Sequence, residues 1–138
     1  MNRIFPFILV EDAKKAIEFY KKALNATLLG EITYYKEWDS QAQYPDKIVH
    51  AALRIEDSQM FIADAINERE DQQERFTVNI ELPSKEAVLH AFEVLKEDAV
   101  KIYYSPQDVG WSDLEFSLKD KFNVLFLIYY RAYKLRKD

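Results

Sequence analysis

The sequence predicts an α+β fold in which two βαβββ modules form an open, curved mixed sheet with a central cavity. Three observations lead to this fold class. The apolar run IFPFILV leads into an amphipathic helix with a capping residue at its start, and a second strand and capped helix of the same design follow about seventy residues later. Three further strand-like runs follow each helix. An internal repeat of this kind indicates two like modules, each of which covers a face that the other would expose.

The composition is that of one globular domain, residues 1–138, with 49% hydrophobic and 31% charged residues. The net charge of −5 argues against nucleic acid as a partner, because binding to phosphates needs clustered Lys and Arg. The chain has no cysteine, which excludes disulfides, thiolate catalysis and cysteine-ligated zinc. No apolar run reaches the length of a membrane span and the N-terminus lacks the layout of a signal peptide, so we expect a cytoplasmic protein without a membrane partner.

The first module is predicted to cover residues 3–66. Its strand at 4–10 is rich in β-branched and aromatic residues, and Pro6 indicates an edge strand or a strand terminus. Asp12 is placed to accept hydrogen bonds from the free amides of the following helix, and Asn25 tolerates the left-handed conformation that often ends one. The apolar face of that helix is formed by Ala13, Ala16, Ile17, Tyr20, Ala23 and Leu24.

Three strands complete the first module, at residues 27–35, 48–55 and 59–64. The polar segment 36–47 is predicted to be a long loop, of the kind that often serves as a lid or a binding loop. Alternation along the middle strand places His50 on the face opposite the apolar side chains that pack under the helix. We therefore expect His50 to point into the cavity.

A charged connector, residues 67–75, leads to the second module at residues 76–131. Its predicted elements follow the order of the first module: a strand at 76–82, a helix capped by Ser84, a strand at 100–104, a turn-rich loop at 105–113, and a closing hairpin of strands at 114–118 and 124–130. When Asp12 is superposed on Ser84, the residue pairs that coincide are Ile17 with Leu89 and Tyr20 with Phe92.

Three stretches carry a resemblance to a known family: EDAKKAIEFYKKALNATLLG, KIVHAALRIEDSQMFIAD and YYSPQDVGWSDLEFSLKDKFNVLFLI. In this order and spacing they resemble the vicinal oxygen chelate superfamily, which includes glyoxalase I, bleomycin-resistance proteins and extradiol dioxygenases, and in particular its PhnB-like branch. The resemblance covers essentially the whole chain and implies a homodimer. Asn25 and Asn123 stand where the family usually has Gly, and Ser112-Asp113-Leu114 stands where relatives usually carry Gly and, two places on, Arg.

The resemblance also implies positions for the divalent metal that many members hold, typically with two His and two Glu as ligands. Carried over residue by residue, these positions fall on Phe5, the segment 61–63, Thr77 or Asn79, and Leu127. The side chains of Phe and Leu have no atom that coordinates a metal. We therefore expect no metal and no other cofactor.

The candidate ligand-binding residues are Phe5, His50, Arg54, Asn79, Glu81 and Trp111. His50 is also the candidate catalytic residue, since histidine titrates near neutral pH, although a pocket histidine that orients a ligand is the plainer interpretation. Glu81 is either a buried partner of His50 or Arg54, or a solvated carboxylate at the rim. Arg54 could bind an anionic ligand or form an exposed salt bridge, and Trp111 could stack on a flat ligand or belong to the core.

The leading hypothesis is a metal-free, PhnB-like protein that binds a small organic molecule in the cavity between its modules. One alternative is a metal-dependent lyase or dioxygenase-type enzyme whose displaced metal site uses His50 and Glu81, with Asp64 as a further candidate ligand. Another is a dimeric, ferredoxin-like barrel of the kind found in small monooxygenases, which needs fewer strands per chain.

Overall fold

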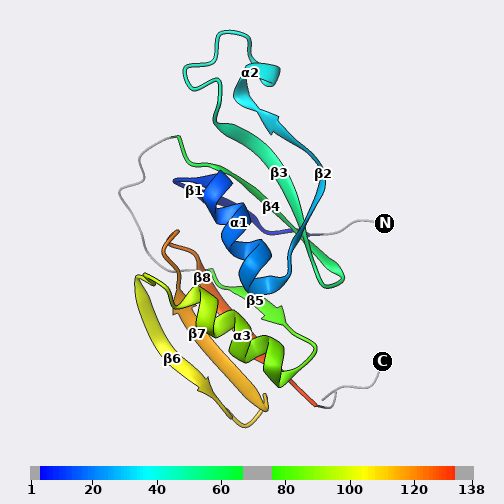
Figure 1. Cartoon of the computed structure of the whole chain (residues 1–138), viewed down its shortest axis with the longest axis vertical. Helices are drawn as coiled ribbons and strands as arrows, with labels where there is room; N and C mark the ends of the chain where they lie inside the picture. Colours follow the sequence, from blue (N-terminus) through cyan, green and yellow to red (C-terminus); the bar gives the residue numbers. More distant parts are fainter. Residues whose placement is uncertain (1–3, 67–75, 133–138) are drawn as a thin grey trace. The chain divides into compact units, whose positions relative to one another are not determined.

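The computed structural model of the chain describes residues 4–66 and 76–132 (Figure 1). The predicted charged connector, residues 67–75, lies outside these residues. The chain divides into two compact units, Met1–Gln73 and Glu74–Asp138, and each unit contains one four-stranded sheet. Within the described residues, every helix is too short or too polar to span a bilayer.

The first unit folds in the order β1 (Phe7–Val10), α1 (Ala13–Leu24), β2 (Thr27–Tyr34), α2 (Tyr35–Trp38), β3 (Ile48–Ile55) and β4 (Ser58–Asp64). Its strand order is β1-β4-β3-β2, with β1 parallel to β4 and the other pairs antiparallel (Figure 1). Strand β1 is an edge strand, as Pro6 predicted. Pro6 has no N–H to donate, and its carbonyl accepts a hydrogen bond from the N–H of Phe61 at 2.9 Å.

Helix α1 is capped at both ends by the residues that the sequence predicts. The side chain of Asp12 accepts a hydrogen bond from the backbone N–H of Lys15 at 3.1 Å. Asn25 adopts the left-handed conformation, with φ 55° and ψ 34°, directly after the last turn. The apolar face of α1 packs on β1, β3 and β4, and it includes Tyr20, which is fully buried. Packing of this face supplies most of the stability of so short a helix.

The carboxylate of Asp64, at the end of β4, joins three elements of the first unit. One oxygen accepts a hydrogen bond from the N–H of Ala13, at the start of α1, at 2.8 Å. The other accepts one from the N–H of Ile48, at the start of β3, at 2.7 Å. Asp64 is only 6% exposed, and its charge faces the positive end of the α1 dipole. One buried side chain thus fixes α1 and β3 relative to β4.

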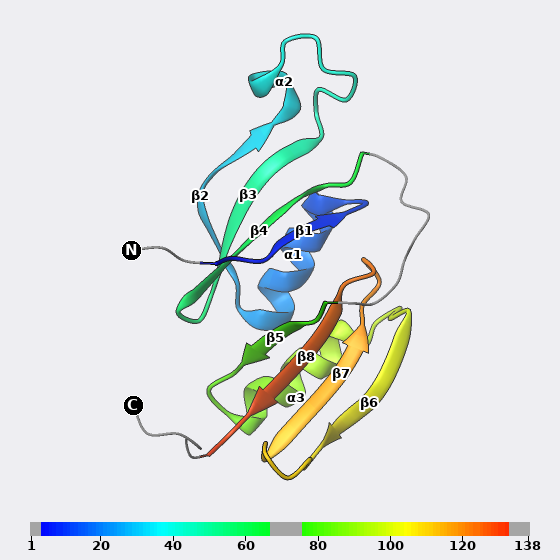
Figure 2. The same cartoon turned by 180° about the vertical axis from the view of Figure 1, so that it is seen from behind.

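The second unit repeats this plan in the order β5 (Val78–Glu81), α3 (Lys85–Leu95), β6 (Lys101–Gln107), β7 (Leu114–Lys119) and β8 (Leu125–Tyr130). Its strand order, β5-β8-β7-β6, corresponds to that of the first unit, with β5 parallel to β8 (Figure 2). Ser84 caps α3 by accepting a hydrogen bond from the N–H of Ala87 at 3.1 Å.

The two sheets confirm the predicted α+β fold of two βαβββ modules. The described residues contain eight strands in two sheets of equal topology, which excludes the ferredoxin-like barrel. The cavity between the modules stays a prediction.

Two segments differ from the predicted elements. Strand β6 continues to Gln107, so the loop predicted from Ser105 begins later than expected. Pro106 is tolerated there because β6 is an edge strand whose pairing with β7 is irregular after Tyr104. In the first unit, Tyr35–Trp38 forms one helical turn where the sequence predicts the end of a strand and the start of a loop.

The two helices of the internal repeat do not bury corresponding faces. Ile17 in α1 is 3% exposed, whereas Leu89, its predicted counterpart in α3, is 48% exposed. Helix α3 instead buries Val88, Ala91, Val94 and Leu95. The apolar stripe of α3 is therefore rotated relative to the stripe of α1.

The left-handed cap of α1 can be tested by substitution. Asn25→Ala is expected to lower the free energy of unfolding by about 1 kcal/mol relative to Asn25→Gly, because a Cβ disfavours this conformation and Ala lacks the local hydrogen bonds of Asn. Urea titration followed by circular dichroism measures the difference. Equal stability of the two variants would contradict this account of the cap.

Asp64 can be tested in the same way. Asp64→Asn is expected to lower the free energy of unfolding by about 1–3 kcal/mol, because the amide retains only one acceptor for two buried N–H groups. The control is Asp46→Asn, since Asp46 is an exposed carboxylate that pairs with Lys36 at 3.3 Å, and its loss should be below about 1 kcal/mol. Equal losses in both variants would remove the special role of Asp64.

Candidate functional site

The face of the first sheet that points away from α1 carries four ring side chains. Strand register pairs Phe7 with Phe61, and their ring centroids lie 6.0 Å apart. The ring of Phe5 lies 5.3 Å from that of Phe61. The imidazole of His50 lies 4.8 Å from the ring of Phe61 and 5.9 Å from that of Phe7. We call Phe5, Phe7, His50 and Phe61 the aromatic cluster.

Strand alternation explains why the aromatic cluster lies opposite the helix. Ala51 and Ile62 are fully buried on the side where β3 and β4 pack against α1, so His50 and Phe61 point to the other side. Phe7 is 50% exposed and His50 is half-buried. The cluster therefore presents aromatic surface and does not merely fill a closed core.

Two predicted site residues, Phe5 and His50, are brought together through Phe61. Arg54 lies apart from them: it is four residues along β3 from His50, about 13 Å at about 3.3 Å per residue. The Nε of Arg54 donates to the carbonyl of Glu56 at 3.1 Å, in the turn after β3. The sequence analysis missed Phe7, although its spacing of two from Phe5 along a strand was a signal for it.

In the second unit, a buried carboxylate occupies the face away from α3. The ring of Phe116 packs against Phe92 of α3 with centroids 5.1 Å apart, so its neighbour Glu115 points to the other face. Glu115 is fully buried. Its Oε1 accepts from the Trp111 indole N–H at 3.2 Å and from the Ser112 hydroxyl at 3.0 Å, and its Oε2 accepts from the hydroxyl of Tyr104.

Tyr104 is held in its protonated form by this arrangement. Burial of its hydroxyl raises the pKa of Tyr104 well above the ordinary value, and the hydrogen bond and negative charge of Glu115 raise it further. Tyr104 therefore remains a hydrogen-bond donor to Glu115 throughout the physiological pH range. Glu115 was not predicted as a site residue, because strand alternation does not show that Tyr104 of β6 and the loop before β7 both donate to it.

Two predicted site residues of this unit, Asn79 and Glu81, lie on the same face of the sheet as Glu115. Strand register places Glu81 across Tyr129 from Glu115, about 10 Å away at two strand spacings. Asn79 is paired with Leu127, and both Asn79 and Glu81 are exposed. Trp111 is 60% exposed although its indole N–H is bound to Glu115. The structure thus joins Trp111 to Glu115 rather than to the residues of β5.

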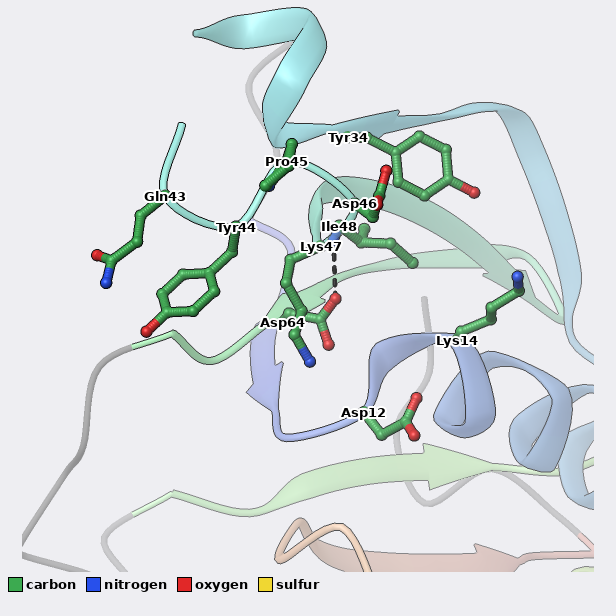
Figure 3. A pocket seen from close by; sticks show the side chains of 10 residues that line it. All are labelled: Asp12, Lys14, Tyr34, Gln43, Tyr44, Pro45, Asp46, Lys47, Ile48 and Asp64. Atoms are coloured by element: carbon green, nitrogen blue, oxygen red, sulfur yellow. Dashed lines mark hydrogen bonds between the residues drawn. The ribbon is translucent and has the colours of Figure 1, made fainter. Parts of the chain in front are cut away.

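A separate pocket of about 460 Å³ opens in the first unit between the first turn of α1 and the segment 36–47 (Figure 3). Tyr44, Pro45 and Lys47 of that segment line it together with Lys14 and Asp64. Both oxygens of Asp64 already accept backbone hydrogen bonds, as described above. The pocket combines charges of both signs, and the role of the segment 36–47 as a lid or binding loop stays a prediction.

Among the described residues, those at the positions that the resemblance assigns to metal ligands do not fit a divalent metal. There, the ring of Phe5 contacts the ring of Phe61, and Asn79 pairs with Leu127. Asp64 cannot join His50 in a displaced site, because Asp64 is bound to the start of α1 whereas His50 points away from that helix. In the described parts of the chain, no group of three or more His, Cys, Asp or Glu side chains is arranged to hold a metal ion.

Comparison with solved structures finds the same fold. The chain is similar to protein PA1353 from Pseudomonas aeruginosa at 18% identity and a TM-score of 0.82, covering 95% of this chain and 98% of that one. It is similar to a PhnB protein from Bacillus cereus at 17% identity and a TM-score of 0.77, covering 94% and 99%. A fosfomycin resistance protein, FosX from Listeria monocytogenes, solved with Mn(II) and dihydroxypropylphosphonic acid, has 17% identity and a TM-score of 0.67, covering 97% and 94%.

At these identities the likeness shows the fold and leaves the activity to be argued from the site. A comparison with curated protein sequences finds no significant match. The sequence model of one family matches residues 2–128, almost the whole chain. With that match and the paired βαβββ units, the chain belongs to the Glyoxalase/Bleomycin resistance protein/Dioxygenase superfamily.

Proposed function

We propose that the chain is a cytoplasmic, metal-free, PhnB-like member of this superfamily that binds a small organic molecule in its cavity. The main helix of each unit covers only one face of its sheet, and in the first unit the other face carries the aromatic cluster. Binding sites for small molecules typically combine apolar and aromatic walls with a few polar groups. The likeness in fold to a PhnB protein supports the assignment to that branch.

One observation carries the proposal: the contact between Phe5 and Phe61, with ring centroids 5.3 Å apart. Both residues fall at or beside positions that the resemblance assigns to metal ligands. Two phenyl rings have no atom that coordinates an ion, but their faces and edges can contact an aromatic or aliphatic ligand. With aromatic side chains at the positions of metal-coordinating residues, this face of the sheet is suited to contact a ring-containing molecule rather than an ion.

His50 supplies the polar contact in this proposal. Its imidazole contacts the rings of both Phe7 and Phe61 and is half-buried, so one ring nitrogen can donate to or accept from a bound molecule while the ring is held by its neighbours. A ligand with a hydrogen-bonding group beside an apolar ring system fits this arrangement.

We also propose a homodimer, and light scattering coupled to size-exclusion chromatography measures this directly. A monomer would contradict the homodimer.

The ligand-binding function is tested with a library of small aromatic compounds. Binding to the wild type is expected, and Phe61→Leu should weaken it about tenfold, because a ring contact contributes about 1 kcal/mol or more beyond its area. Phe76→Leu is the matched control, because Phe76 is 90% exposed. Calorimetric titration gives both affinities. If no compound binds, or if the two variants lose affinity equally, the proposed site is wrong.

The metal-free state has its own test. Purified protein is expected to contain no stoichiometric Mn, Fe, Ni or Zn by elemental analysis, and its midpoint of thermal unfolding should not rise when these ions are added, since nothing would bind the native state preferentially. A stoichiometric metal that is lost in His50→Ala would contradict the proposal and favour the metal-dependent enzyme.

A further inference from the structure

The two tryptophans of the chain, Trp38 and Trp111, are both largely exposed, at 73% and 60%. Trp38 lies in the short helix α2 and contacts Tyr35, with ring centroids 6.1 Å apart. Trp111, by contrast, donates its indole N–H to the fully buried carboxylate of Glu115. An exposed ring with a buried anchor is held in one orientation at little further entropic cost when a ligand binds.

The backbone around Trp111 is also fixed. Gly110 has φ +97°, a conformation that a side chain would disfavour, and its N–H donates to Asp108 Oδ1 at 2.8 Å. The N–H of Val109 donates to the carbonyl of Ser112 at 3.2 Å, and that of Asp113 donates to the carbonyl of Tyr130 at 3.0 Å. The loop before β7 is therefore a set of short hydrogen-bonded turns that present the ring of Trp111.

The charge of Glu115 is held by neutral donors alone. Its three partners are the hydroxyls of Tyr104 and Ser112 and the indole N–H of Trp111. Within the described residues, no Lys, Arg or His forms an ion pair with Glu115. Lys119 lies four residues further along β7, about 13 Å away at about 3.3 Å per residue. The negative charge beneath Trp111 is thus hydrogen-bonded but forms no ion pair within the described residues. The guanidinium of Arg131 lies 5.2 Å from the ring centroid of Tyr129, the cross-strand neighbour of Glu115, and does not form an ion pair with this carboxylate.

This arrangement favours a positive charge over the indole. The face of an aromatic ring is negative, and an N–H donated to a carboxylate increases the electron density of the ring. A cation over the indole also interacts with the charge of Glu115 itself, and burial weakens the screening of that interaction by water. Both effects strengthen the binding of a cationic ring relative to a neutral ring of the same shape.

We propose that Trp111 and Glu115 form a charge-selective stacking site for a planar cationic group, in which Trp111 contacts the ligand and Glu115 is a positioning residue that also sets the preferred charge. This inference rests on the proposed function and names the class of ligand that the second unit selects.

The test uses two probes that differ in charge, 10-methylacridinium and neutral acridine at pH 8, with affinities from calorimetric titration. The wild type is expected to prefer the cation about tenfold, within the range of cation–π contributions. Glu115→Gln should reduce this preference to about one- to twofold while it changes the affinity for acridine less than threefold. Trp111→Leu should weaken both probes, and Trp38→Leu, the matched control, should weaken neither.

Tyr104→Phe separates charge from packing, because it removes one donor to Glu115 and keeps the carboxylate. The preference for the cation should survive in this variant, and circular dichroism verifies that each variant is folded. An unchanged preference in Glu115→Gln, or equal effects of Trp38→Leu and Trp111→Leu, would overturn the inference. Binding of other compounds that depends on Phe61 but not on Trp111 would overturn the inference and leave the proposed function standing. Absence of any binding would overturn both.

Discussion

Each sheet of this protein packs against one long helix, and that helix covers only one of the two faces of a four-stranded sheet. The rest of the structure follows from this constraint. Helix-facing side chains such as Leu53 and Phe116 are apolar and fully buried. The positions that alternate with them are not restricted to apolar residues, and they include His50 in one unit and Glu115 in the other. The candidate chemistry therefore lies on the faces that no helix of the same unit covers.

Two buried carboxylates show how the face determines the role of a residue. Asp64 lies on the helix side, where its partners are the backbone N–H groups of Ala13 and Ile48, and it holds the fold together. Glu115 lies on the face away from the helix, where its partners are side chains, and one of these is the exposed Trp111. Asp64, bound to backbone groups, therefore stabilises the fold. Glu115 is hydrogen-bonded to an exposed side chain, so its charge can affect a molecule that contacts that side chain.

The alternation of apolar residues and the helix caps made the fold predictable from sequence. Asp12, Asn25 and Ser84 mark helix ends through local hydrogen bonds and backbone preferences, which a sequence displays directly. Strand alternation predicted that His50 lies on the face opposite the helix, whereas Phe5 was named through the family resemblance, and the structure brings both into contact with Phe61. By contrast, the bonds of Asp64 reach 51 and 16 residues along the chain, and one bond of Glu115 reaches 11 residues to Tyr104, in an irregular stretch of β6. Such contacts are set by tertiary structure and leave no local pattern.

In our proposal, aromatic rings stand where the resemblance assigns metal ligands, so that the protein binds an organic molecule rather than an ion. Native mass spectrometry of the purified protein, compared with its denatured mass, tests this claim most directly. The account predicts that the native species gains the mass of a small organic molecule when an aromatic ligand is supplied, and that this gain is reduced in Phe61→Leu. A native species that carries only one divalent metal ion per chain, with no organic molecule retained, would contradict it.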